Sequence, residues 1–255
     1  MIDHTQIKLG KKAARFDPRT LKMAKYLGPS IDPPPASTDW LANVTSWPMY
    51  ANDKLGDCVE AAGAHMVELW EKYTNSNKPQ PTNTDVLKAY EGAAGYIPGD
   101  PSTDNGTDML TFLKYWRNTG IGGHKILAFV SLKRGDLTEL QQAIWLFGSA
   151  FIGVQLPVSV QSRNEWTVPN GLTGDYAPGS WGGHCIPVGA YSDLVPARTR
   201  NRVVTWGEVV TMSDYFYQIM SDEAYAVLSQ DWIDTNGLAP SHFDLAALQA
   251  DLAAL

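Results

Sequence analysis

The chain has 255 residues, of which 44% are hydrophobic and 18% are charged, and its formal net charge is -7. This length supports one substantial core, which two lobes can share. The composition is that of an ordinary globular protein and excludes a disordered chain. The negative charge and the lack of a basic patch argue against a nucleic-acid binder.

The N-terminus lacks the basic start and apolar run of a secretion signal. No stretch approaches the roughly 18 uninterrupted apolar residues that a membrane span needs. Two cysteines do not make a disulfide framework. These features predict a soluble, cytoplasmic protein with reduced thiols and no membrane partner. The composition is consistent with a bacterial or phage origin, and the sequence leaves the oligomeric state open.

The pattern of turns and apolar residues divides the chain into four parts. Residues 1–50 are expected to form an arm packed on the body, because Trp40 and Trp47 can pin it there. The other parts are a helical lobe, a β lobe and a C-terminal helical tail, at residues 51–123, 124–235 and 236–255. Helices first and strands later indicate an α+β protein with segregated lobes.

Apolar periodicity and capping residues give the expected elements in chain order. The helices are a short one from Asp17 to Tyr26, then Val59–Tyr73, Thr84–Glu91 capped by Asn83 or Thr84, Asp108–Asn118, a helix to Phe147 that Asp136 caps and Gly148 ends, and Ser241–Leu255. The strands are Lys125–Leu132, Ala150–Leu156, His184–Tyr191, Arg202–Trp206 and Ala224–Leu228. A loop from Gly92 to Gly106, rich in Gly, Pro and Asp, is long enough to form a wall of a cleft.

Cys58 follows a glycine turn and begins the apolar helix Val59–Tyr73. Free backbone N–H groups and the helix dipole favour a thiolate at this position, and they can also hold a negative oxygen. Residue type and position therefore suit a nucleophile, against the alternative of an inert buried cysteine. Asp57 next to it would oppose a thiolate, so capping of the helix is its expected role.

His184 stands where the glycine-rich sequence Trp181-Gly-Gly becomes a strand. Side chains alternate along a strand, so Cys185 is expected on the opposite face from His184, in the apolar layer. This leaves Cys58 as the reactive thiol and makes Cys185 a packing residue.

Together these residues resemble the papain-like cysteine peptidases. The resemblance rests on Asn52, five intervening residues and Cys58 at the head of a long helix, followed by His184 at the start of a strand. His184 lies 184 − 58 = 126 residues after Cys58, close to the roughly 130 typical of papain-like enzymes. Compact cell-wall amidases share only the order of the two residues, because their histidine follows much sooner.

The resemblance implies a papain-like fold, with a helical N-terminal lobe against a mainly antiparallel β lobe and the site in the cleft between them. It also implies that Asn52 takes the place of the glutamine that donates to the oxyanion in this family. The family's histidine-orienting asparagine is replaced by the sequence Val204-Thr-Trp206-Gly207, in which Thr205 is expected to accept an imidazole N–H. Asn201 precedes that strand and is expected at its other end.

The expected function is hydrolysis of a peptide, isopeptide or related amide bond in a peptide or protein substrate, by a Cys58 thiolate paired with His184. The alternative is a papain-fold protein with weak or no catalysis, kept for binding or assembly. The arm can also lie in the cleft as a built-in inhibitor, as pro-segments do in this family. No cofactor or metal is expected, because no histidine or cysteine stands at metal-ligand spacing.

Overall fold

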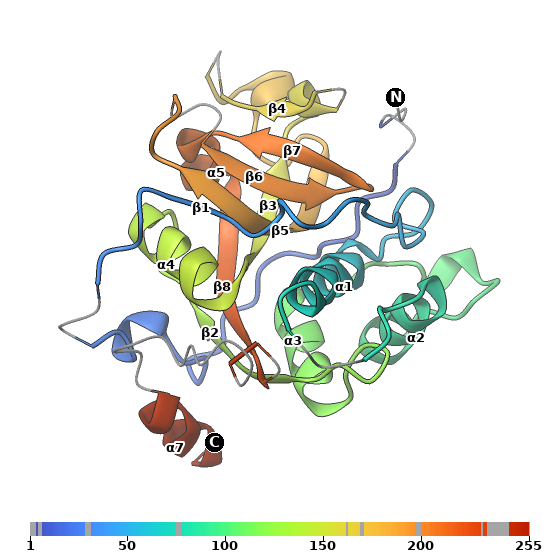
Figure 1. Ribbon diagram of the computed structural model, residues 1–255. Coiled ribbons are helices and arrows are strands. Elements are labelled where there is room, and N and C mark those ends of the chain that lie inside the picture. Colours follow the sequence, from blue (N-terminus) through green and yellow to red (C-terminus); the bar gives the residue numbers. More distant parts are fainter. Residues whose placement is uncertain are drawn as a thin grey trace.

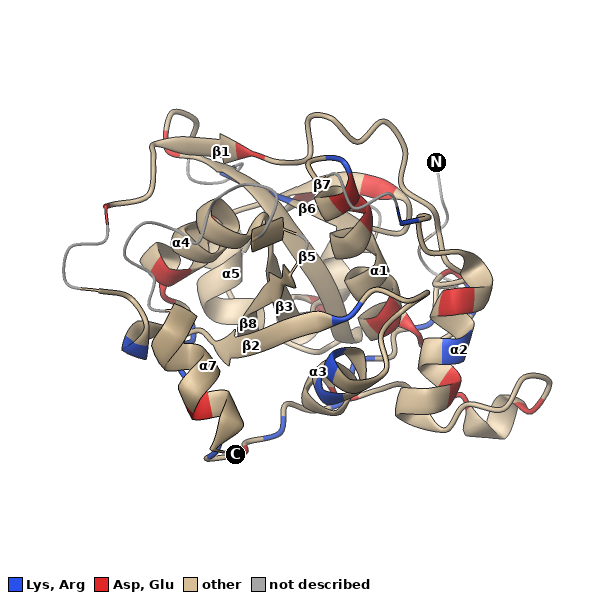
Figure 2. Cartoon of the chain, turned by 60° about the horizontal axis from the view of Figure 1, so that its bottom comes forward, with Lys and Arg blue, Asp and Glu red and all other residues tan. Residues whose placement is uncertain are grey.

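A mixed sheet forms the centre of the molecule, with helices on both of its faces (Figure 1 and Figure 2). The computed structural model describes residues 4, 7–28, 32–74, 78–161, 163–168, 171–196, 200–230, 232–233 and 245–254. Within these residues the sheet has eight strands in the order β2-β8-β3-β5-β6-β7-β4, and β1 pairs with β5. Among the described strands, β4 and β7 are parallel and all other neighbours are antiparallel.

The central strands combine β-branched and aromatic side chains with nearly continuous burial, which is typical of a sheet covered on both faces. They are β1 (Ser37–Asp39), β2 (Ile126–Ser131), β3 (Ala150–Leu156), β4 (Glu165–Trp166), β5 (Gly182–Ser192), β6 (Asn201–Thr205), β7 (Glu208–Met212) and β8 (Ser221–Ser229). β5 is the central strand, and it pairs with β3, β6 and β1.

Helices α1, α2 and α3 form a group on one side of the sheet, and α4, α5 and α7 lie on the other side (Figure 2). Their bounds are α1 (Cys58–Glu71), α2 (Asn83–Ala94), α3 (Met109–Asn118), α4 (Leu137–Phe147), α5 (Asp214–Met220) and α7 (Leu245–Ala253). In α2, α3, α4 and α5 the N-cap side chain accepts a backbone N–H of the first turn, which fixes where the helix begins.

Two apolar layers fill the space between the sheet and the two groups of helices. Val59, Phe112 and Trp116 belong to the layer under α1 and α3, whereas Ile144 and Phe216 belong to the layer under α4 and α5. β5 contributes to both layers, because Cys185 faces the first and Ile186 and Val188 face the second. The alternation expected at Cys185 is confirmed, and both cysteines are free thiols.

The α+β class and most of the expected elements agree with the structure. Capping of α4 by Asp136 and its end at Gly148 are confirmed. α2 is capped by Thr82 rather than by Asn83 or Thr84, because Thr82 and Asp85 form a reciprocal capping box. β7 and α5 were not expected, and the expected C-terminal helix Ser241–Leu255 extends at both ends beyond the described residues.

The helix expected from Asp17 to Tyr26 is wrong. Asp17 accepts the Arg19 backbone N–H at 3.0 Å in a local turn, and only Met23–Lys25 form one turn of 3-10 helix. Lys22 instead pairs with Ser131 at the end of β2, so this part of the chain follows the sheet rather than coiling on itself.

Close packing of α1 against α3 depends on Gly63. A Cβ at this position would lie 2.7 Å from Cζ of Phe112. We expect Gly63→Ala to lower the free energy of unfolding by about 1–3 kcal/mol, because overpacking outweighs the gain in helix propensity. Urea titration measures this change, and Phe112→Leu in the same chain should remove most of it. An equal or higher stability of Gly63→Ala would contradict the tight contact.

Candidate active site

Cys58 is the first residue of α1 and is 1% exposed. Burial raises the pKa of its thiol to about 12, although the backbone N–H groups of Gly10 and Cys185 point at the sulfur and lower it. Cys185 follows His184 near the start of β5, so the contact with its N–H places the Cys58 sulfur next to the backbone that carries His184. α1 packs along β5, which keeps the helix N-terminus at this point of the sheet.

His184 is buried on β5, and its Nε2 lies 2.8 Å from Oγ1 of Thr205 on β6. The Trp206 ring stacks on the imidazole, with 4.5 Å between centroids and 18° between planes. Burial, followed by the charge of His4, lowers the pKa of His184 to about 3. Nδ1 is buried and has no hydrogen-bond partner among the described residues, so one ring nitrogen is held while the other is available.

The turn between β6 and β7 explains how Trp206 reaches the imidazole. Trp206 and Gly207 are its two central residues and have φ values of 46° and 74°. Two positive φ values in a two-residue hairpin are those of a type I′ turn. Asn201 lies at the other end of β6, where its amide donates to Met212 O and to Asp214. It therefore has no contact with His184.

Asn52 is buried just before α1, in a tight turn in which Tyr50 and Ala51 have φ values of 55° and 66°. Its Nδ2 donates to Oδ1 of Asp57 at 3.1 Å. Asp57 stands at the N-cap of α1, but its side chain accepts no backbone N–H of the helix. Its expected capping role is therefore wrong, because the carboxyl is turned toward Asn52.

Asp57 is one of three buried acids in or next to α1. Burial raises the pKa of Asp57 to about 8, with the Asn52 hydrogen bond acting in the opposite direction. Burial also raises the pKa of Glu60 to about 8 and that of Glu68 to about 7. The Asp57 carboxyl is thus mostly protonated at neutral pH, which spares the thiol a neighbouring negative charge.

The N-terminal segment passes directly over Cys58. Thr107 N donates to Gly10 O at 2.9 Å, Lys12 N donates to Thr107 O at 3.0 Å, and Lys11 N donates to Gly183 O at 3.1 Å. In Figure 1 this segment runs between the strands and the group of α1 to α3. Gly10 permits the close approach, since a Cβ there would lie 1.8 Å from Gly56 O. The sequence predicts an arm that packs on the body or lies in the cleft, but it does not indicate that Gly10 is the residue that reaches Cys58.

Solved structures with the same chain path identify the fold. Xylellain, a cysteine protease from Xylella fastidiosa, matches with a TM-score of 0.66 and 14% identity over 88% of this chain and 96% of that chain. The fold is papain-like. A proCathepsin B from Trypanosoma congolense has a TM-score of 0.53 and 12% identity over 90% of this chain and 85% of its own. A recombinant stem bromelain precursor has a TM-score of 0.55 and 14% identity over 88% and 78%.

At these identities the likeness shows the papain-like fold alone. No protein-family model matches the sequence, and the search of curated proteins gives no match. The expected papain-like, α+β architecture is confirmed, whereas the roles of Cys58, His184, Asn52 and Thr205 stay predictions.

Three further features concern metal binding, His65 and membrane spans. No group of three or more His, Cys, Asp or Glu side chains there is placed to hold a metal ion. His65 is buried in α1 and bonds to Pro48 O, as expected for a packing histidine. No helix in the described ranges is both long and apolar enough to cross a bilayer.

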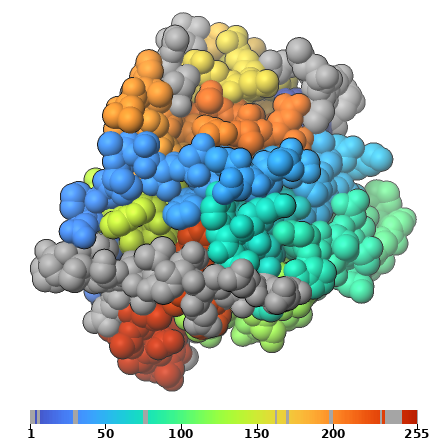
Figure 3. Space-filling model, viewed as in Figure 1, coloured from blue at the N-terminus to red at the C-terminus, as the bar shows by residue number. Residues whose placement is uncertain are grey.

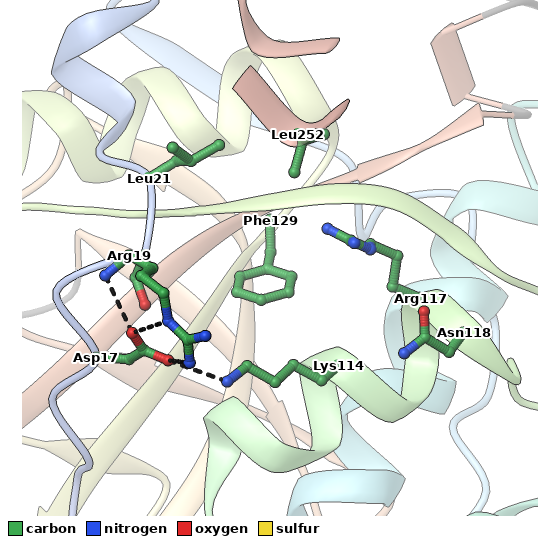
Figure 4. A pocket seen from close by; sticks show the side chains of 9 residues that line it. Asp17, Arg19, Leu21, Lys114, Arg117, Asn118, Phe129 and Leu252 are labelled. Carbon is green, nitrogen blue, oxygen red and sulfur yellow. Dashed lines mark hydrogen bonds and ion pairs between the residues drawn. The ribbon is translucent and has the colours of Figure 1, made fainter. Parts of the chain in front are cut away.

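Beyond Lys12 the arm continues along the surface. Asp17 bonds to Lys114 of α3 at 3.1 Å and to Arg19, at the edge of a hollow of about 300 Å³ (Figure 4). Residues 32–50 then cross the surface between two parts of the molecule, the strands β6 and β7 on one side and helix α1 on the other (Figure 3). The arm is thus attached to the papain-like body at several points that follow the segment covering Cys58 in the chain.

The raised pKa of Asp57 predicts how stability depends on pH. An unfolded aspartate ionises near pH 4 and folded Asp57 near pH 8, so unfolding releases a proton between these values and stability falls as pH rises. His65 and His184, whose pKa values burial lowers to about 4 and about 3, favour the opposite trend below about pH 6.5 and contribute little well above it, where they are mostly neutral in both states.

Asp57→Asn keeps the acceptor for Asn52 and removes the proton. We expect its unfolding free energy to fall less steeply from pH 6.5 to pH 8, by up to about 1.4 kcal/mol per pH unit relative to the wild type. Urea titrations at both pH values measure this difference. Asp175→Asn, at an exposed position, is the control and should follow the wild type. Parallel pH profiles for Asp57→Asn and the wild type would contradict a buried, protonated Asp57.

Proposed function

We propose that this papain-like protein is a thiol hydrolase that cleaves an amide bond in a peptide or protein and is held closed by its own N-terminal segment. The observation that supports this most directly is the state of the His184 ring. Thr205 occupies Nε2, and Nδ1 has no hydrogen-bond partner in the described chain. The Cys58 sulfur accepts the backbone N–H of Cys185, the residue after His184.

In the open site, Cys58 would pass its proton to Nδ1 of His184, giving a thiolate and an imidazolium. The sulfur attacks the carbonyl carbon of the substrate and forms a C–S bond, and the carbonyl oxygen becomes an oxyanion. His184 then protonates the leaving amine as the C–N bond breaks. It later takes a proton from water, whose oxygen displaces the sulfur and releases the acid.

The Cys58 backbone N–H and Asn52 Nδ2 are the proposed donors to the oxyanion. The amide nitrogen of Asn52 carries two hydrogens, of which one binds Asp57 and the other is left to donate. The bond to Asp57 fixes the side chain, so the buried acid would act as a positioning residue for Asn52.

The N-terminal segment explains why the pair is neutral in this structure. Burial is the largest cause both of the raised pKa of Cys58, about 12, and of the lowered pKa of His184, about 3. A thiol and an imidazole with these values do not exchange a proton at neutral pH. Displacement of the segment admits water and removes this cause, so opening would restore the thiolate–imidazolium pair.

Gly10→Ala tests the proposal without altering any residue of the site. The added Cβ would overlap the backbone of Gly56 and should keep the segment from lying over Cys58. We expect iodoacetamide to label Cys58 of this variant selectively at pH 5 to 8, at least about tenfold faster than the wild type, below the usual thiol pKa of about 8.5. Peptide mapping by mass spectrometry measures labelling at each cysteine.

Ala13→Val, at an exposed position of the same segment, is the control and should label as slowly as the wild type. His184→Ala in the Gly10→Ala chain should abolish fast labelling. The opened chain should also digest an unfolded protein such as casein, and Cys58→Ala should not. Slow and equal labelling of both cysteines after opening would overturn the hydrolase in favour of a papain-fold protein that serves binding or assembly.

Thr205 is the proposed positioning residue for His184. Thr205→Val conserves the volume but removes the acceptor for Nε2. In the Gly10→Ala chain we expect it to slow labelling of Cys58 at pH 6 by about tenfold, the value of roughly one hydrogen bond. Thr205→Ser should restore the rate. Unchanged labelling in Thr205→Val, measured over pH 5 to 8, would show that Trp206 stacking alone holds the ring.

A further inference from the structure

Lys11 has the most completely buried charged side chain in the segment over Cys58, with 0% of it exposed. Its Nζ lies 2.9 Å from Oδ2 of Asp222 and 3.0 Å from Oε1 of Glu223, and it donates to Lys12 O at 3.1 Å. An ammonium group has three hydrogens to donate, and three oxygens surround this one. The side chain therefore fills a pocket in which Asp222 and the Lys12 carbonyl accept hydrogen bonds from the ammonium group and Glu223 lies at ion-pair distance.

The two carboxylates are themselves held in place at the start of β8. Asp222 Oδ2 accepts from Gln155 Nε2 at 2.6 Å, and Glu223 Oε2 accepts from the Tyr225 hydroxyl at 2.9 Å. Burial raises the pKa of Glu223, and Lys11 offsets part of this effect. Two fixed, largely buried carboxylates without a cation are costly, so the emptied pocket favours any positive group that can enter.

The channel to the carboxylates exists because residue 153 has no side chain. A Cβ on Gly153 of β3 would lie 2.0 Å from Lys11 Cε and 2.9 Å from Asp222 Oδ1. Met109, the first residue of α3, forms the other wall, with its sulfur 2.8 Å from the same point. In the sheet Gly153 stands between Cys185 of β5 and Glu223 of β8, which places the pocket next to the strand that carries His184.

The backbone around Lys11 links the pocket to the nucleophile. The N–H of Gly10 points at the Cys58 sulfur, and the N–H of Lys11 bonds to Gly183 O. Thr107 bonds to the residues on both sides of Lys11. These are main-chain bonds that any extended peptide can form. A peptide that forms the same main-chain bonds would place one side chain in the pocket. That side chain would belong to the residue next to the one that contacts the Cys58 sulfur.

We propose that the pocket formed by Gly153, Met109, Asp222 and Glu223 is the specificity pocket of the hydrolase, and that it selects substrates with a lysine or arginine side chain next to the reacting bond. This assignment rests on the proposed function. Lys11 occupies the pocket in the closed chain and so stands in for the substrate residue. Asp222 Oδ1 is buried and has no hydrogen-bond partner among the described residues, which leaves an acceptor for the additional donors of arginine.

A binding experiment tests the pocket independently of catalysis. The protein is the full chain with Gly10→Ala, Lys11→Ala and Cys58→Ala, which is open, empty and inert. The probes are blocked synthetic peptides of residues 7–16 that carry Lys, Arg, norleucine or Glu at position 11. We expect the Lys and Arg peptides to bind at least about tenfold more tightly than the norleucine peptide, a difference of about 1.4 kcal/mol. The Glu peptide should bind weakest.

Asp222→Asn with Glu223→Gln should remove the preference for Lys and Arg. Glu165→Gln, at an exposed position of β4, is the matched control and should keep it. Gly153→Ala should close the channel and weaken binding of the Lys and Arg peptides most. Equal affinities for Lys and norleucine peptides, in a chain whose circular dichroism matches the wild type, would overturn the pocket.

Cleavage mapping then tests the assignment to substrate. The chain with Gly10→Ala and Lys11→Ala digests denatured casein, and the products are sequenced by mass spectrometry. We expect Lys or Arg at one fixed position near every main cleavage site, and a loss of that preference in Asp222→Asn with Glu223→Gln while Cys58 labelling is unchanged. Cleavage without a basic residue at a fixed position would overturn the inference and leave the hydrolase standing. An opened chain that neither cuts nor labels at Cys58 would instead contradict the hydrolase, and the peptide affinities would still decide whether the pocket recognises a cation.

Discussion

The close approach of the N-terminal segment to the backbone around Cys58 is the constraint on which the state of the site depends. Gly10 lies against Gly56, and the carbonyl of Lys11 lies 2.3 Å from where a Cβ of Gly183 would be. No water layer fits between such surfaces, so the segment removes the Cys58 sulfur, which the Gly10 N–H contacts, from solvent. The main-chain ladder to Thr107 and Gly183 compensates the covered polar groups, and the ion pairs of Lys11 supply the specific part of the contact.

The same burial organises the charges on the helical side of the site. Asp57, Glu60 and Glu68 lie in or next to α1, and burial raises the pKa of each, to about 8, about 8 and about 7, which favours the protonated form of Asp57 and Glu60 at neutral pH. Glu60 accepts from the Thr107 hydroxyl at 2.7 Å, so an acid of α1 supports the loop that pairs with the segment. Thr107 thereby connects the helix that carries Cys58 to the chain that covers it.

Local signals predicted the parts of the fold that depend on neighbouring residues. Asp136 and Gly148 bound α4 by capping, and the apolar run at 150–156 forms β3, as predicted. Thr205 was the candidate partner of His184 because Trp206 and Gly207 mark the end of its strand, and its hydroxyl lies at hydrogen-bond distance. α2 was predicted with the wrong cap because two residues, Thr82 and Asp85, act together.

The remaining features depend on contacts between distant residues, which a single sequence does not show. The turn of Asp57 toward Asn52 depends on the burial of both side chains. The course of the segment over Cys58 depends on glycines at positions 10, 56 and 183, which are far apart in the chain. The acidic pair Asp222 and Glu223 opens an apolar strand, a position where carboxylates are unusual, and this was the available signal for the pocket.

The attachment of the arm on the C-terminal side of Gly10 has a consequence for kinetics. Asp17 and Lys22 hold the chain to α3 and β2, so a displaced segment stays within a few residues of its binding site. A short tether of this kind gives an effective concentration on the order of millimolar. A free peptide substrate therefore competes with the tethered N-terminal segment for the same site. The site is expected to open to substrate only when the substrate concentration is comparable with that effective concentration. A single cut between Lys12 and Asp17 would abolish that requirement, because the released segment would dilute into solution.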